Sequence, residues 1–150
     1  MTTPPEAPTA LQLLERLWGL DHALDSASKR MLRDIGISSP QRVVLRLITL
    51  EGGMGPGEIA RRMRHHPATI STLLNRLEEA GYVERRHSVE DRRRSTVVVT
   101  KRGRALGERT QGTIEARIEA ALQGLDPAKV ADCLAVLDTL VEALAPVADE

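Results

Sequence analysis

The segment from Asp91 to Gly103, DRRRSTVVVTKRG, restricts the fold more than any other part of the chain. Three consecutive arginines cannot be buried, so they must be solvated, paired with acids or offered to a polyanion. The β-branched run Thr96–Val99 favours a strand, as do Tyr82 and Val83 before the polar, turn-prone segment 85–91. The pattern predicts a β-hairpin with a basic tip. Taken alone, it fits a solvated turn with a local Asp91–arginine pair equally well.

The residues upstream predict two short helices joined by a turn. Residues 57–63 place Ile59, Ala60 and Met63 on one helical face, and the following His65-His66-Pro67 interrupts the pattern. Proline fits the first turn of a new helix, where its missing N–H would have no partner. The second helix has one apolar stripe facing a core, and Gly81 can end it with a positive φ. The stripe consists of Ile70, Leu73, Leu74 and Leu77.

The opposite face of this second helix carries short polar side chains and one arginine. Such a face suits a helix laid into the major groove of DNA, while arginines in a neighbouring hairpin suit phosphates or a narrow minor groove. The candidate DNA-binding residues are therefore Ala68, Thr69, Ser71, Thr72, Asn75 and Arg76 on the helix, and Arg92, Arg93 and Arg94 in the hairpin.

Two motifs carry a resemblance to a known family. Asp91, Arg93, Val97, Val99, Thr100 and Gly103 match a pattern of D-x-R, an alternating strand ending in L-T, and a glycine after two more residues, with valine replacing the leucine. Residues 68–81, ATISTLLNRLEEAG, match S-T-V-T-x-L-V-x-R-L-E-x-x-G. On these motifs the chain resembles the multiple-antibiotic-resistance-regulator (MarR) family. The resemblance implies a mainly α fold with a small antiparallel β-hairpin wing (α+β): a winged helix-turn-helix over residues 39–103, flanked by N- and C-terminal dimerisation helices.

The charge distribution supports a polyanion-binding middle region. The whole chain has 21 basic and 21 acidic residues, but residues 58–104 contain twelve basic and six acidic ones, which leaves the remainder with nine and fifteen. The middle therefore carries +6 and the ends −6. Phosphate contacts from such a region would provide affinity, and the polar face of the second helix would provide specificity.

Both ends of the chain are apolar helices that predict a dimer. Residues 9–35 form a helix with a wide apolar stripe, and residues 104–146 form two helices, a long one over 105–123 and a last one that starts with Asp126 as N-cap. The resemblance implies that these regions form a two-fold dimer, which would space two recognition helices about 34–36 Å apart. Packing within the chain accounts for part of the stripe. Residues 1–8 are expected to be a disordered tail.

One further helix is expected between these regions. Ser39 is its predicted N-cap and Pro40 its first residue, and its buried face comprises Val43, Val44, Leu47, Ile48 and Leu50. The glycine-rich residues 51–57 lack the G-x-x-x-x-G-K-[ST] pattern of a phosphate loop, so we interpret them as a turn, where the family has a short first strand.

Several classes of protein are disfavoured. The four histidines do not have metal-ligand spacing, no serine has a plausible catalytic triad around it, and no cofactor is expected. No apolar stretch of about 18 residues predicts a membrane span, and the N-terminus does not have the pattern of a signal peptide. Cys133 is the single cysteine, which rules out an internal disulfide and favours the cytoplasm; it lies on a predicted apolar face, where thiols are usually buried and inert.

The sequence thus predicts a homodimeric bacterial transcription regulator, most often a repressor, that binds a pseudo-palindromic double-stranded DNA operator and is not an enzyme. The resemblance implies release by a small-molecule effector in a pocket for which Trp18, His22, Arg46 and Leu50 are the candidate lining residues. Two alternatives stay open: a winged-helix adaptor for protein interactions, and a DNA-binding regulator that is ligand-independent or redox-gated.

Overall fold

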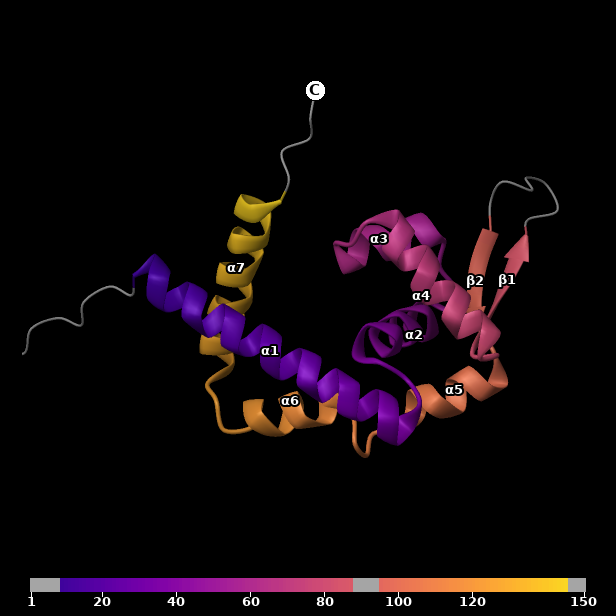
Figure 1. The fold of residues 1–150 in the computed structure, drawn as a ribbon, viewed down its shortest axis with the longest axis horizontal. Coiled ribbons are helices and arrows are strands. Elements are labelled where there is room, and N and C mark those ends of the chain that lie inside the picture. The colour runs from indigo at the N-terminus through magenta and orange to yellow at the C-terminus, as the bar shows by residue number, and fades with distance from the viewer. Residues whose placement is uncertain (1–8, 88–94, 146–150) are drawn as a thin grey trace, which may run out of the picture. The chain divides into compact units, whose positions relative to one another are not determined.

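The computed structural model describes residues 9–87 and 95–145, which divide into two compact units with a boundary after Ile114. Within the described residues the fold is mainly helical with one antiparallel sheet of two strands, as predicted. In chain order, the elements are α1 (Ala10–Ile35), α2 (Ser39–Glu51), α3 (Pro56–Met63), α4 (Pro67–Glu79), β1 (Val83–His87), β2 (Ser95–Val99), α5 (Lys101–Glu108), α6 (Ile114–Leu122) and α7 (Pro127–Leu144) (Figure 1).

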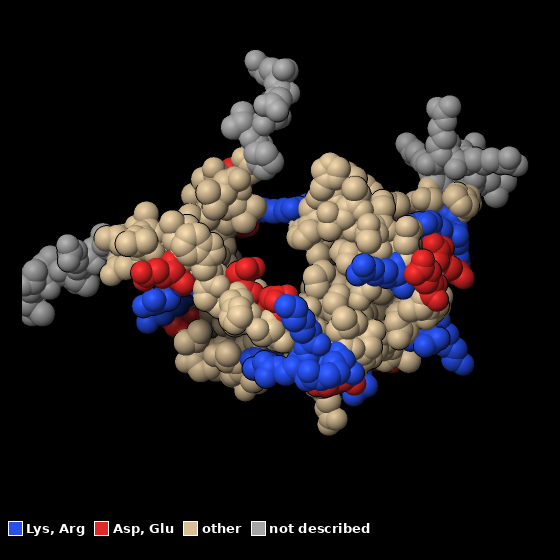
Figure 2. Space-filling model, viewed as in Figure 1, with Lys and Arg blue, Asp and Glu red and all other residues tan. Residues whose placement is uncertain are grey.

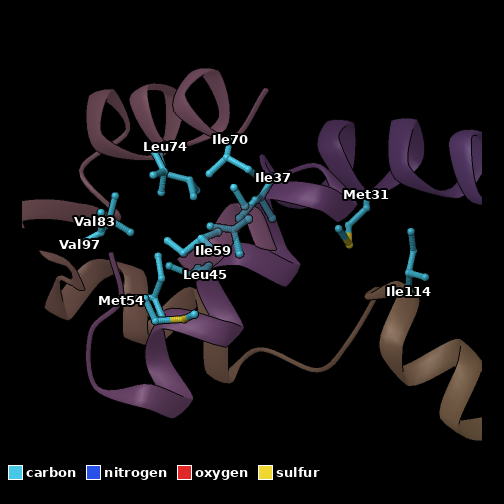
Figure 3. Close-up of a cluster of buried hydrophobic side chains, with 14 residues drawn as sticks. Met31, Ile37, Leu45, Met54, Ile59, Ile70, Leu74, Val83, Val97 and Ile114 are labelled. Carbon is cyan, nitrogen blue, oxygen red and sulfur yellow. The ribbon is translucent and has the colours of Figure 1, made fainter. Parts of the chain in front are cut away.

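The core of the first unit lies where α2, α3, α4 and the hairpin meet. Leu45 and Ile48 of α2, Ile59 of α3, and Leu74 of α4 are at most 1% exposed. Figure 3 shows the side chains of Ile70 and Leu74 directed from α4 into this cluster. The predicted apolar stripes of α3 and α4 are confirmed by this burial, because only the faces that carry them are removed from water.

The hairpin attaches to this core through one side of its sheet. Val83 pairs with Val99 and Arg85 with Val97 in the antiparallel register, and Met54 adds an isolated bridge to Val97. Successive side chains of a strand point to opposite faces, so Val83 and Arg85 share the face that also holds the buried Val97. The turn 51–57 contributes only this single bridge from Met54. The first strand extends further than expected, because residues 85–87, interpreted as turn, belong to β1.

The predicted buried face of α2 was partly wrong. Val43 is 36% exposed and Leu50 is 72% exposed, whereas Leu45 and the charged Arg42 are buried. The difference between the predicted and the observed buried face follows from the burial of Arg42, which faces the end of α5. Its guanidinium donates to the carbonyls of Leu106 (3.0 Å) and Arg109 (2.6 Å) at the end of α5, and these bonds compensate its loss of water. The N-cap is Ser38 rather than Ser39, and Ser38 N–H donates to Gln41 Oε1 at 3.0 Å.

The long helix expected over residues 105–123 was also wrong, because α5 ends at Glu108 and α6 begins at Ile114. Arg109 is in an extended conformation, and Gly112 adopts a φ of +76°, which few residues other than glycine tolerate. Thr113 is buried and its hydroxyl donates to Thr110 O at 2.8 Å, which stabilises the turn.

The last helix lacks a buried face of its own. In α7 no residue is buried, and Leu134 and Leu144 are 59% and 72% exposed. Asp126 does cap this helix as predicted, because its carboxylate accepts from Ala128 N–H at 2.9 Å. The expectation that Cys133 is buried was wrong: the thiol is exposed, since nothing in the described chain covers that face. None of the helices in residues 9–87 and 95–145 has the length and apolarity needed to cross a bilayer.

Candidate nucleic-acid interface

The polar face of α4 is open to solvent along its whole length. The candidate base-contacting residues on this helix, Ala68, Thr69, Ser71, Thr72, Asn75 and Arg76, are all exposed. The buried residues Ile70, Leu74 and Leu77 fix the rotation of the helix about its axis, so this polar face must point away from the core. The structure thus brings the six predicted helix residues together on one surface, which we call the α4 face.

The N-terminal end of α4 is anchored by histidine. His66 is the N-cap, and its Nδ1 accepts a hydrogen bond from Ala68 N–H at 3.2 Å. Pro67 follows at the first helical position, as the sequence predicts. The neighbouring His65 makes a different contact, since its Nδ1 lies 2.6 Å from Met63 O and must donate to it. The sequence motif gave no indication that His66 caps the helix.

The polar groups on the α4 face are partly engaged already. The Thr72 hydroxyl donates to Ala68 O at 3.1 Å, which leaves its methyl group and oxygen lone pairs for another partner. Asn75 Oδ1 accepts from Arg85 Nη2 at 2.7 Å, so a β1 residue reaches back to the helix. Arg85 also pairs with Glu78, with 3.1 Å between Nη1 and Oε2. Sequence reasoning missed Arg85, because its placement depends on the pairing of β1 with β2.

The face of β1 that points away from the core carries a second arginine, Arg86. Arg86 donates through Nε (2.9 Å) and Nη2 (2.6 Å) to Glu84 Oε1, two residues away on the same side of β1. Figure 2 shows lysine and arginine side chains on both sides of an acidic group where the first unit carries the hairpin, and a larger basic group at the lower edge of the view. The predicted DNA-binding residues Arg92, Arg93 and Arg94 lie outside the described residues.

Thr100 and Gly103 form a tight corner between the hairpin and α5. The Thr100 hydroxyl donates to Gly81 O at 2.7 Å and accepts from Gly103 N–H at 3.1 Å, so one side chain joins the end of α4 to the start of α5. A Cβ on Gly103 would lie 1.9 Å from Tyr82 O, far inside van der Waals contact. These contacts give a physical reason for the T-x-x-G pattern: the backbones approach too closely for any side chain.

The four candidate effector-binding residues are exposed, two on α1 and two on α2. Trp18 and His22 are one turn apart on α1, and Trp18 is 67% exposed. Arg46 and Leu50 are one turn apart on α2, and Arg46 Nη1 donates to Gly107 O at 3.4 Å. Their role in ligand binding stays a prediction. Among the residues that the structure describes, no group of three or more His, Cys, Asp or Glu side chains could hold a metal ion.

A sequence profile of the MarR family matches residues 37–95, which include α2, α3, α4 and β1. The winged-helix region of this chain is thus similar to the MarR family. The HTH-type transcriptional repressor Rv2887 of Mycobacterium tuberculosis is 35% identical over 85 residues, which are 57% of this chain and 61% of that repressor. The HTH-type transcriptional regulator TtmR of Methylorubrum extorquens is 32% identical over 63% of this chain and 49% of its own.

Solved structures share the fold over most of the chain. The Staphylococcus aureus MepR–DNA complex superposes with a TM-score of 0.74 at 20% identity, covering 91% of this chain and 99% of MepR. PcaV of Streptomyces coelicolor, solved with its natural ligand, gives a TM-score of 0.71 at 21% identity over 95% and 99% of the two chains.

Proposed function

We propose that this chain is a sequence-specific DNA-binding transcription regulator of the MarR family that works as a homodimer and most often as a repressor. The α4 face carries this proposal: a row of short, exposed, hydrogen-bonding side chains on a helix whose other side is locked into the core. Such a helix fits a major groove, and the basic hairpin beside it fits the neighbouring backbone. MepR and several relatives with this fold or sequence bind DNA or are described as repressors.

A test of DNA binding can separate the roles of helix and hairpin. Duplexes selected from a randomised pool with the purified chain should share a pseudo-palindromic sequence. Asn75→Ala or Thr72→Ala should then change the preference among sequences at fixed salt, whereas Arg93→Ala should weaken binding to all duplexes and lower the salt slope by about one. Equal effects of both kinds of substitution on operator and random DNA would contradict these roles.

The dimer is supported by the apolar surface of α7. Val130, Leu134, Leu137, Val141 and Leu144 recur at intervals of three and four, so they form one stripe along the helix, and none of them is buried. A second copy is the partner that the proposed palindromic operator requires. Sedimentation of the full chain should show a dimer, and Leu134→Glu with Val141→Glu should convert it to a monomer. A dimer that tolerates both charges would exclude this stripe as the interface.

The proposal also includes a small-molecule effector that releases the protein from its operator. It rests on neighbours with the same fold: PcaV was solved with its natural ligand, and BpsR of Bordetella bronchiseptica is regulated by 6-hydroxynicotinic acid. Such a ligand shifts DNA binding only if it prefers one of two dimer geometries. A screen of small aromatic acids for operator release, repeated with His22→Ala and Arg46→Ala, tests whether these two of the four predicted residues take part; release that both variants retain would argue against them.

The adaptor alternative predicts a different result. A protein-interaction module would retard no DNA fragment even in dilute buffer, where phosphate contacts are strongest.

Redox gating is a further alternative, now favoured by one observation, because Cys133 is exposed rather than buried. Operator affinity that is unchanged after alkylation of Cys133 would exclude it.

A further inference from the structure

The side-chain amide of Asn75 has a fixed orientation in the free protein. Arg85 Nη2 lies 2.7 Å from the Asn75 side chain. A guanidinium carries hydrogen-bond donors and no acceptor, so the atom that faces it must be the carbonyl oxygen Oδ1. The other end of the same amide, Nδ2, is a donor. Asn75 therefore presents its donor end away from Arg85, on the exposed α4 face.

Arg85 is itself held in place. Its Nη1 lies 3.1 Å from Glu78 Oε2, and its backbone N–H donates to Glu78 Oε1 at 3.3 Å. The Arg85 side chain is 30% exposed and sits on the core-facing side of β1 together with Val83. Releasing Arg85 from Asn75 would leave a guanidinium that remains tied to Glu78. The three side chains thus form a chain of contacts from α4 to the hairpin and back to α4.

We propose that Arg85 determines which base Asn75 recognises, by restricting Asn75 to hydrogen-bond donation. This inference rests on the proposed function, in which the α4 face enters a major groove. A free asparagine pairs with adenine by donating to N7 and accepting from the N6 amino group. When Asn75 Oδ1 already accepts from Arg85, the N6 amino group of adenine can reach only the second lone pair of Oδ1. There it would lie beside the guanidinium, and both groups are hydrogen-bond donors. Guanine, with acceptors at both N7 and O6, has no such conflict.

Asn75 should consequently favour guanine over adenine at the position it contacts. The expected preference is about tenfold, the size of one well-placed base contact. In this mechanism Arg85 is a positioning residue: it acts through Asn75 and touches no base. Its removal should restore the acceptor function of Oδ1 and shift the preference toward adenine.

The chain offers a matched control at the next position. Arg86 lies on the same strand but on the opposite face, where it donates to Glu84. Arg85→Met and Arg86→Met each remove one positive charge and leave an unbranched side chain. Both should weaken phosphate binding and reduce the salt slope to a similar extent. Only Arg85→Met should free Asn75 Oδ1.

The experiment uses the full chain and an operator selected from randomised duplexes. Asn75→Ala first identifies the base pair that Asn75 contacts, as the position whose preference becomes flat. Dissociation constants are then measured for the four base pairs at that position. We expect wild type to favour guanine over adenine by about tenfold, Arg85→Met to reduce this ratio to about twofold or less, and Arg86→Met to weaken all four duplexes by one common factor.

Three results would overturn the inference: a wild-type preference for adenine, an unchanged guanine-to-adenine ratio in Arg85→Met, or no position that responds to Asn75→Ala. If wild type selects no sequence at all, the proposed function itself fails, which is a different result. Arg85→Lys is a second variant for the case in which Arg85→Met does not fold. It keeps the charge, but a single ammonium cannot bridge Glu78 and Asn75 in the manner of a guanidinium fork, so the ratio should fall here too. An unchanged ratio in a folded lysine variant counts against the inference.

Discussion

The winged-helix part of the first unit and the helix α7 of the second unit bury their apolar side chains to very different degrees. Leu74 of α4 is 1% exposed, whereas Leu134 of α7 is 59% exposed. Both helices have leucines at regular helical spacing, so periodicity alone does not distinguish them. The difference teaches that the first region is held together by contacts within one chain, while the apolar stripe of α7 stays exposed in the described chain, as expected if the proposed dimer covers it.

The largest expected effect comes from truncating the same residue type in the two regions. Leu74→Ala should lower the free energy of unfolding by about 2–5 kcal/mol, because it removes a fully buried side chain and leaves a cavity. Leu134→Ala should change the stability of the monomer by at most about 0.5 kcal/mol, since its side chain is in water there. Urea unfolding at several protein concentrations separates the two cases: the loss for Leu74→Ala should not depend on concentration, and any loss for Leu134→Ala should.

A Leu134→Ala monomer destabilised as strongly as Leu74→Ala would break the comparison, since α7 would then be packed within its own chain. The control is Leu144→Ala, at the exposed end of the same stripe, where the residue is 72% exposed. It should resemble Leu134→Ala in the monomer.

A second contrast uses glycine. Gly103→Ala should destabilise the chain by about 3 kcal/mol or slightly more, because the added methyl meets the Tyr82 carbonyl at 1.9 Å and the backbone must move. Gly124→Ala, in the second unit, has nothing within 4 Å of the added methyl and should be almost neutral. Thermal unfolding followed by circular dichroism measures both. A Gly103→Ala protein as stable as wild type would show that the corner between β2 and α5 is not tightly packed.

The sequence was sufficient where a residue's role depends on its neighbours along the chain. The stripes of α3 and α4, the proline starts of α4 and α7, and the Asp126 cap follow from local spacing, and the structure confirms them. The D-x-R and T-x-x-G motifs were sufficient to indicate the family. The rotation of α4 could also be inferred, because its apolar and polar faces are cleanly separated.

The sequence was insufficient where a role depends on a distant segment. Arg42 resembles a surface residue in its local pattern, but it is 3% exposed because the end of α5, more than 60 residues away, supplies its hydrogen-bond acceptors. The break between α5 and α6 was missed because Gly112 interrupts an otherwise helical pattern with a positive φ. The contact between Arg85 and Asn75 was missed because it needs the register of the hairpin.

Arg42 provides a third, smaller test. Arg42→Met should cost about 1–3 kcal/mol of unfolding free energy, because carbonyls at the end of α5 would lose their donors while remaining partly buried. Arg46→Met is the matched control: this exposed arginine of the same helix makes only a long contact of 3.4 Å to Gly107 O, and its loss should have little effect. Equal losses for the two variants in urea unfolding would mean that burial of Arg42 does not matter.

The smallest expected effect concerns the N-cap of α4. His66→Ala removes the acceptor for Ala68 N–H and should cost about 1 kcal/mol, whereas His66→Asn supplies another cap and should cost less. His65→Ala controls for the loss of an exposed imidazole. The loss should also be local, since a missing cap mainly frays the first helical turn. Hydrogen exchange should therefore speed up at residues 68–70 and stay unchanged in α7. Faster exchange throughout the chain would instead show that the N-terminus of α4 contributes to global stability.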